Sequence, residues 1–70
     1  MERKVYSVEE AQVIGDALSV DWGVISLSEF HLGLNIELEQ HREKHPTDKQ
    51  LGEKVLANIN DFPLYYSEYN

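Results

Sequence analysis

The chain has 70 residues, with 13 Asp and Glu against 6 Lys and Arg, a formal net charge of −7 and 41% hydrophobic residues. This length predicts a single domain over 1–70, and the acidic balance argues against nucleic acid or an anionic membrane as a partner. The chain has no cysteine, which excludes disulfide scaffolds and Cys-ligated zinc, and it shows no membrane span or signal-peptide core, so the cytoplasm is the expected location.

Three capping boxes mark the starts of predicted helices. In a capping box, a Ser or Thr at the N-cap and a Glu or Gln three residues later each satisfy a backbone N–H. The pairs that fit, each ahead of an apolar periodic stretch, are Ser7 with Glu10, Ser26 with Glu29, and Thr47 with Gln50. They predict an all-α bundle of three main helices plus a short C-terminal helix. A mixed fold with a hairpin over 20–27 is the alternative.

The first predicted helix covers residues 8–18. Ala11, Ile14 and Leu18 recur at helical spacing and form an apolar stripe. Gly15 lies inside this helix, where glycine costs up to ~1 kcal/mol relative to alanine. We therefore expect Gly15 to permit a close crossing with another helix.

A connection is predicted over residues 19–25, and it contains the only tryptophan of the chain. Tryptophan has a large apolar ring system and one polar N–H. We expect Trp22 to plug one end of the core with its indole N–H hydrogen-bonded.

The second predicted helix covers residues 27–44 and is apolar on two sides. One side carries a continuous stripe made of Leu27, Phe30, Leu34, Leu38 and His41. Leu32 and Ile36 lie on roughly the opposite side. Such a helix is either sandwiched between neighbouring elements or half-buried in a second subunit. A chain that hides only ~60% of its surface on folding gains from either arrangement.

The third predicted helix begins after Thr47 and reaches about Asn60. The residue before a proline avoids the α region, so the preceding helix must end at His45-Pro46. Pro63 suits the first turn of a short last helix over 64–69. The residues predicted to fill the core are Ile14, Leu18, Trp22, Phe30, Leu34, Leu38, Leu51, Val55, Ile59 and Phe62.

Three segments within residues 8–66 form a distinctive set: Val20-Asp21-Trp22, Glu37-Leu38-Glu39, and Pro63 followed by Tyr65-Tyr66. Together they resemble a family of small bacterial, archaeal and phage proteins of unknown function. The resemblance implies a compact domain and no particular chemistry. In that family a His-Gly follows Glu-Leu-Glu and a His-Leu precedes the last acidic-Pro segment. In this chain Gln40-His41 stands in place of His-Gly, and Asn58-Ile59 stands in place of His-Leu. Gln40 and Asn58 therefore replace the two family histidines, and neither has an imidazole.

Glu37, His41 and His45 recur every four residues on the second predicted helix. Carboxylate and imidazole are ligands for zinc and other divalent ions, and this spacing brings the three side chains to one helical face. They are the candidate metal ligands, and a divalent metal is the one cofactor considered. The alternative is structural, with Glu37 and His41 as an ion pair and His45 at the negative end of the helix dipole.

Catalytic groups are weakly indicated, and we predict that the protein is not an enzyme. His31 borders the apolar stripe and has the chemistry of a general base, but no nucleophile is evidently paired with it. Glu37, Glu39 and Glu43 could supply paired acids of the glycosidase kind, but such chemistry needs a deep cleft. A hydrogen-bonded histidine and a solvated acidic face are the simpler interpretations.

The tyrosine-rich C-terminus and the second apolar side of residues 27–44 favour protein interaction, because tyrosine is enriched at interfaces. The candidate contact residues are Leu32, Ile36, Tyr65, Tyr66 and Tyr69. Alternatively, Tyr65 or Tyr66 packs on Trp22 and Phe62 to close the core. The sequence thus predicts a non-enzymatic interaction module that binds a protein partner or a second copy. A small metal-binding protein, and an acidic decoy or inhibitor of a basic protein, are the alternative functions.

Overall fold

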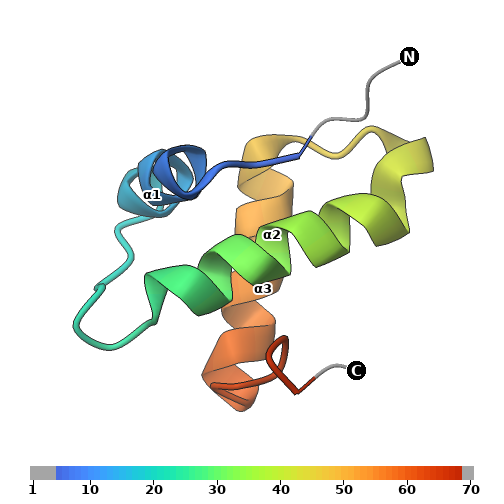
Figure 1. The fold of residues 1–70 in the computed structure, drawn as a ribbon. Helices are drawn as coiled ribbons and strands as arrows, with labels where there is room; N and C mark the ends of the chain where they lie inside the picture. The colour runs from blue at the N-terminus through green and yellow to red at the C-terminus, as the bar shows by residue number, and fades with distance from the viewer. Residues whose placement is uncertain (1–4, 69–70) are drawn as a thin grey trace.

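The computed structural model describes residues 5–68, and three α-helices dominate this part of the chain (Figure 1). They are α1 (Val8–Ala17), α2 (Leu27–His41) and α3 (Asp48–Asp61), and a short 3-10 helix, η1 (Arg42–Lys44), directly follows α2. Residues 5–68 contain no strand, and residues 22–24 form turns where a hairpin was the alternative. The all-α prediction is therefore confirmed.

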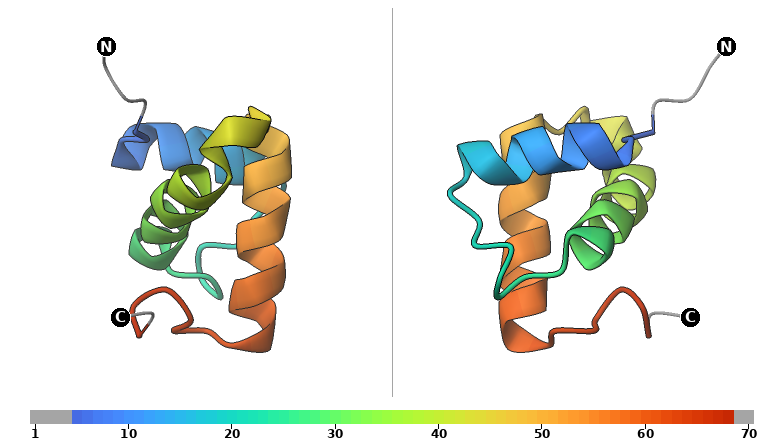
Figure 2. Two further views of the ribbon diagram at one scale, coloured as in Figure 1. Left: turned by 90° about the vertical axis from the view of Figure 1, so that its right-hand side faces the viewer. Right: turned by 60° about the vertical axis from the view of Figure 1, so that its left-hand side comes forward.

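The second helix packs on both of the others. In Figure 1, α2 crosses in front of α3, and Figure 2 shows α1 lying across the first turns of α3. The chain after α3 turns back toward the start of α2, as both views of Figure 2 show. Within residues 5–68, none of the helices combines the length and the apolar character that crossing a membrane requires.

The helix starts follow the capping pattern of the sequence. Both reciprocal hydrogen bonds of a capping box are present at Ser7–Glu10 and at Thr47–Gln50. Ser26 Oγ accepts a bond from Glu29 N at 3.2 Å, but the Glu29 side chain is buried and its carboxylate binds elsewhere. The third box is therefore only half formed.

The end of the second helix and the expected C-terminal helix differ from the prediction. The α-helical part of α2 ends at His41, and the chain then tightens into η1 and reaches His45, whose φ of 50° is left-handed. A tightened last turn and a left-handed residue are usual ways to end a helix ahead of a proline. The predicted helix over 64–69 is not confirmed, because residues 63–68 form turns and position 69 lies outside the described residues.

The core lies where the three helices meet, and two tyrosines from outside the helices complete it. Its buried apolar residues are Tyr6, Ala11, Ile14, Ile25, Phe30, Leu34, Leu38, Leu51, Val55, Ile59 and Tyr66. Leu18 and Trp22 are partly buried against this cluster. The prediction was wrong for Phe62, which is 55% exposed because the backbone leaves the helix there in an extended conformation.

Trp22 closes one end of the core as expected. Its Nε1 donates to Asp16 Oδ1 at 2.8 Å, and its ring meets Phe30 edge to face with the ring centroids 5.6 Å apart. A Cβ added at Gly15 would stand 2.3 Å from Trp22 Cη2. Gly15 thus makes room for the indole ring, and Phe30 Cε2 of α2 would lie 3.5 Å from the same Cβ.

Candidate functional site

Two carboxylates of α2 are buried, and they define a constrained polar site. Glu29 and Glu37 are each 3% exposed. A buried carboxylate costs several kcal/mol unless it is paired or hydrogen-bonded. The hydrogen-bond partners of these two side chains therefore show which groups the fold brings to the buried carboxylates.

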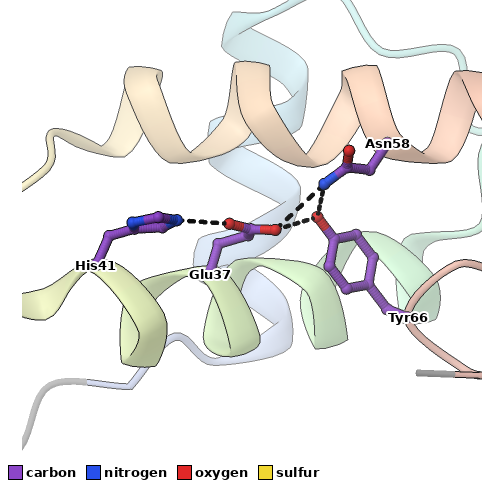
Figure 3. Close-up of polar contacts among 4 residues, drawn as sticks. All are labelled: Glu37, His41, Asn58 and Tyr66. Atoms are coloured by element: carbon purple, nitrogen blue, oxygen red, sulfur yellow. Dashed lines mark hydrogen bonds and ion pairs between the residues drawn. The ribbon is translucent and has the colours of Figure 1, made fainter. Parts of the chain in front are cut away.

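Glu37 lies at the centre of a polar network between α2, α3 and the C-terminal segment, residues 62–68. Its Oε2 accepts a hydrogen bond from Tyr66 Oη at 2.8 Å and one from Asn58 Nδ2 at 3.2 Å (Figure 3). Asn58 Nδ2 also donates to Tyr66 Oη at 2.8 Å. On its other side, Glu37 Oε1 lies 3.2 Å from His41 Nε2. Three side chains from three elements, those of His41, Asn58 and Tyr66, therefore converge on one buried carboxylate.

Tyr66 brings the C-terminal segment into this network. Its side chain is 1% exposed, and its ring edge meets the ring of Tyr65 with the ring centroids 4.9 Å apart. Burial raises the pKa of Tyr66, and the hydrogen bond to the Glu37 carboxylate raises it further, while the bond from Asn58 acts in the opposite direction. The hydroxyl therefore stays protonated and serves as a donor to Glu37.

Glu29 fastens the same segment at its backbone. Its Oε2 accepts hydrogen bonds from Tyr66 N at 2.6 Å and Ser67 N at 3.0 Å, and Ser67 Oγ donates to Oε1. In a helix those two N–H groups would bond to carbonyl oxygens four residues earlier, which explains why turns replace the predicted helix. The sequence gives no sign of this role, because Glu29 also fits a capping box.

The metal hypothesis depends on three side chains, of which the structure brings two together. Glu37 and His41 form an ion pair within α2. His45 follows η1 in a left-handed conformation, so the helical spacing assumed for it does not exist. Within residues 5–68, no group of three or more His, Asp and Glu side chains is arranged to hold a metal ion. Metal binding at these residues stays a prediction that this geometry does not support.

A shallow hollow of about 330 Å³ lies beside His41. Its lining residues are His41, Lys44, Pro46, Gln50, Leu51 and Lys54. Glu37 Oε1 lies 3.2 Å from the imidazole Nε2 but forms no hydrogen bond with it. The lining holds no Ser, Thr or Cys that this imidazole could activate as a nucleophile.

His31 has a structural partner. Its Nε2 lies 2.8 Å from Tyr6 O, and Asn35 Nδ2 donates to the same oxygen at 3.0 Å. Tyr6 N donates in turn to Asn35 Oδ1 at 2.7 Å, and Tyr6 Oη donates to Asp48 Oδ1 at 2.5 Å. These bonds hold the residues before α1 against α2 and α3.

The three carboxylates considered as paired acids lie in different environments. Glu37 is buried, whereas Glu39 and Glu43 are exposed. Glu39 Oε1 pairs with Arg42 Nη2 at 3.1 Å on the surface of the helix. The three side chains therefore do not share a cleft.

The candidate contact residues are divided between surface and core. Leu32 is 39% exposed, and Ile36 and Tyr65 are partly buried. Tyr66 belongs to the core, where its ring lies against Gly33. Tyr69 lies outside the described residues. The surface part of the predicted contact set thus consists of Leu32, Ile36 and Tyr65.

Comparisons with known proteins identify no relative of this chain. No protein-family model matches the chain, and no curated protein or solved structure is significantly similar to it. The resemblance carried by the Val-Asp-Trp, Glu-Leu-Glu and Pro-x-Tyr-Tyr segments therefore stays a prediction. Of the two positions where family histidines were expected, Asn58 takes part in the Glu37 network through its amide.

Proposed function

We propose that the protein is a non-enzymatic interaction module that forms a homodimer in the cytoplasm through one surface, the dimer face. The dimer face consists of Leu32 and Ile36 on α2 with Leu64 and Tyr65 on the C-terminal segment. The observation that carries the proposal is that two buried carboxylates fasten this segment while Leu64 stays 53% exposed. Fixing a segment whose apolar side chain faces solvent adds little to the core, but it preorganises a surface for binding.

Contacts of the C-terminal segment support a continuous dimer face. Tyr66 packs so closely on α2 that a Cβ added at Gly33 would stand 2.6 Å from its Cε2 atom, and its hydroxyl binds Glu37. Leu32 and Ile36 follow Glu29 by three and seven residues, so they share the side of α2 on which the Glu29 carboxylate binds the segment. Their apolar surface therefore adjoins that of the segment.

The charge distribution favours a second copy as the occupant of the dimer face. Residues 30–36 and 62–67 contain no Asp, Glu, Lys or Arg, although the chain carries a net charge of −7. Two acidic copies repel each other, and the repulsion is smallest where the facing patches are uncharged. A twofold dimer uses the same patch on both copies, so this patch must face a copy of itself without charge repulsion.

Sedimentation equilibrium over a dilution series from about 1 mM to about 1 μM tests the dimer. We expect the mass to fall from twice the 8.1 kDa chain mass to the chain mass on dilution. Leu32→Glu should shift the transition to higher concentration by about tenfold or more, because it brings two carboxylates together on an apolar patch.

The matched control is Val13→Glu on α1, which makes the same change in net charge where the side chain is 67% exposed and lies outside the dimer face. This variant should dimerise like the wild type. A wild-type chain that stays at the monomer mass at about 1 mM would overturn the proposal. So would a Leu32→Glu variant that associates as the wild type does.

A further inference from the structure

A second surface, away from the dimer face, forms a groove between α1 and the start of α3. Two neighbouring hollows of about 250 Å³ and 400 Å³ share Val13, Ile14 and Asp48 among their lining residues, and together they are called the α1 groove. It extends from Tyr6 at one end to Leu18 at the other. Figure 2 shows the crossing of α1 over the first turns of α3 where this groove lies.

The α1 groove is apolar along its length. Ile14, Ala17 and Leu18 line it, and Val13 is 67% exposed beside them. A valine exposed to this extent next to a hollow leaves apolar surface that a partner can cover. The 10 residues of α1 measure about 15 Å, which matches three turns of a second helix. These dimensions suit the insertion of an amphipathic helix into a groove.

The rim of the α1 groove is acidic. Glu9 and Glu10 line it on α1 and Asp48 lines it on α3, and among residues 5–68 Lys49 is the one lysine or arginine in its lining. Hydrogen bonds from neutral donors fix two of these carboxylates, since Ser7 N donates to Glu10 and Tyr6 Oη donates to Asp48. The negative charges are therefore held at defined positions around an apolar floor.

We propose that the α1 groove binds an amphipathic helix of a partner protein whose apolar row is flanked by Lys and Arg. The apolar row lies on Val13 and Ile14, and the cations approach Glu9, Glu10 and Asp48. A second copy of this chain is a poor occupant, because its α1 carries Glu9, Glu10 and Asp16 and no Lys or Arg. The α1 groove thus gives a defined surface to the alternative in which an acidic chain inhibits a basic protein.

The probe is a synthetic peptide of about 12 residues with Leu at i, i+3, i+4 and i+7 and Lys elsewhere. It is titrated into the full chain while backbone amide signals are followed by NMR. We expect saturable shifts concentrated in α1 and the first turn of α3. A scrambled peptide of the same composition should bind at least about tenfold more weakly, since its apolar row is lost.

Two variants with the same change in net charge separate docking from general attraction. Glu9→Lys alters the rim of the α1 groove, whereas Glu53→Lys alters an exposed position of α3 that does not line it. We expect Glu9→Lys to raise the dissociation constant about tenfold and Glu53→Lys to change it less than about twofold. Val13→Lys should also weaken binding by about tenfold, because it places a cation in the apolar floor.

Three results would overturn the proposal: equal effects of Glu9→Lys and Glu53→Lys, equal binding of the scrambled peptide, or no shifts at about 1 mM peptide. Leu32→Glu should bind the peptide like the wild type, because the α1 groove does not depend on the dimer face. Loss of peptide binding in Leu32→Glu would also count against a separate site. The experiments can therefore disprove the proposed dimer and the proposed helix-binding groove independently of each other.

Discussion

Gly33 lies where the Tyr66 ring and Val55 press against α2. A Cβ at this position would stand 2.6 Å from Tyr66 Cε2 and 2.8 Å from Val55 Cγ1. Alanine usually stabilises a helix interior by about 1 kcal/mol relative to glycine. We nevertheless expect Gly33→Ala to lower the free energy of unfolding by about 1–3 kcal/mol, because the added methyl group must displace the ring. Urea unfolding followed by circular dichroism measures the change.

Gln12→Ala is the control, since Gln12 is exposed in the middle of α1. It should change the free energy of unfolding by less than about 0.5 kcal/mol. A Gly33→Ala protein that is as stable as the wild type, or more stable, would show that Tyr66 does not pack on α2 in this way.

Among the elements, the C-terminal segment has two of its backbone N–H groups bound to a single side chain, that of Glu29. Glu29 accepts from Tyr66 N, Ser67 N and Ser67 Oγ. Glu29→Gln replaces the carboxylate with an amide that has one acceptor oxygen and no charge. We expect the free energy of unfolding to fall by about 1.5–3 kcal/mol, because charged acceptors form the stronger bonds. Hydrogen exchange should accelerate at Tyr66 N and Ser67 N before the helices lose protection.

The same substitution at an exposed position isolates the role of burial. Glu10→Gln changes the capping box of α1, where glutamine is an accepted partner. It should leave both the stability and the exchange at residues 66 and 67 nearly unchanged. If Glu29→Gln behaved like Glu10→Gln, the segment would be held by something other than the carboxylate.

Helix starts and apolar stripes could be predicted from the sequence because their causes are local. The Ser7–Glu10 and Thr47–Gln50 boxes connect residues three apart, and their bonds form within one turn. The turns after α3 could not be predicted, because two of their backbone donors, Tyr66 N and Ser67 N, bind Glu29. The sequence separations of these two contacts are 37 and 38 residues. A contact at that separation follows from the packed structure and leaves no periodic pattern.

The candidate site shows the same division. The Glu37–His41 pair was foreseen from its spacing of four residues within one helix. Asn58 and Tyr66 complete that site from α3 and the C-terminal segment, and only the tertiary arrangement brings them to Glu37. His45 was misplaced because the spacing rule assumes a continuous α-helix, which ends at His41.

On the scale of the whole molecule, the two ends of the described chain are anchored in the same way. Tyr6 lies before α1 and donates its hydroxyl hydrogen bond to Asp48, and Tyr66 lies after α3 and donates to Glu37. Both side chains are at most 4% exposed. Burial raises the pKa of Tyr6 and of Tyr66, and the neighbouring carboxylates raise both further. The folded chain therefore requires two protonated phenols.

This requirement predicts a loss of stability at alkaline pH. Below the ordinary tyrosine pKa of about 10, both folded and unfolded chains are protonated, so the full contribution is present. Above it, the unfolded chain releases protons that the folded chain retains, and stability falls by up to about 1.4 kcal/mol per pH unit for each tyrosine. Urea midpoints measured between about pH 8 and pH 11 should therefore show no tyrosine-linked loss up to about pH 9 and should fall above about pH 10.

Tyr6→Phe and Tyr66→Phe separate this effect from the titration of the lysines, which all variants retain. Each variant removes a donor from a carboxylate and should be less stable than the wild type near pH 8. Each should also lose stability less steeply above about pH 10, because one proton-binding difference has been removed. Since Tyr66 lies deep in the Glu37 network, a Tyr66→Phe protein with the wild-type slope would mean that this phenol ionises as readily in the folded chain as in the unfolded one.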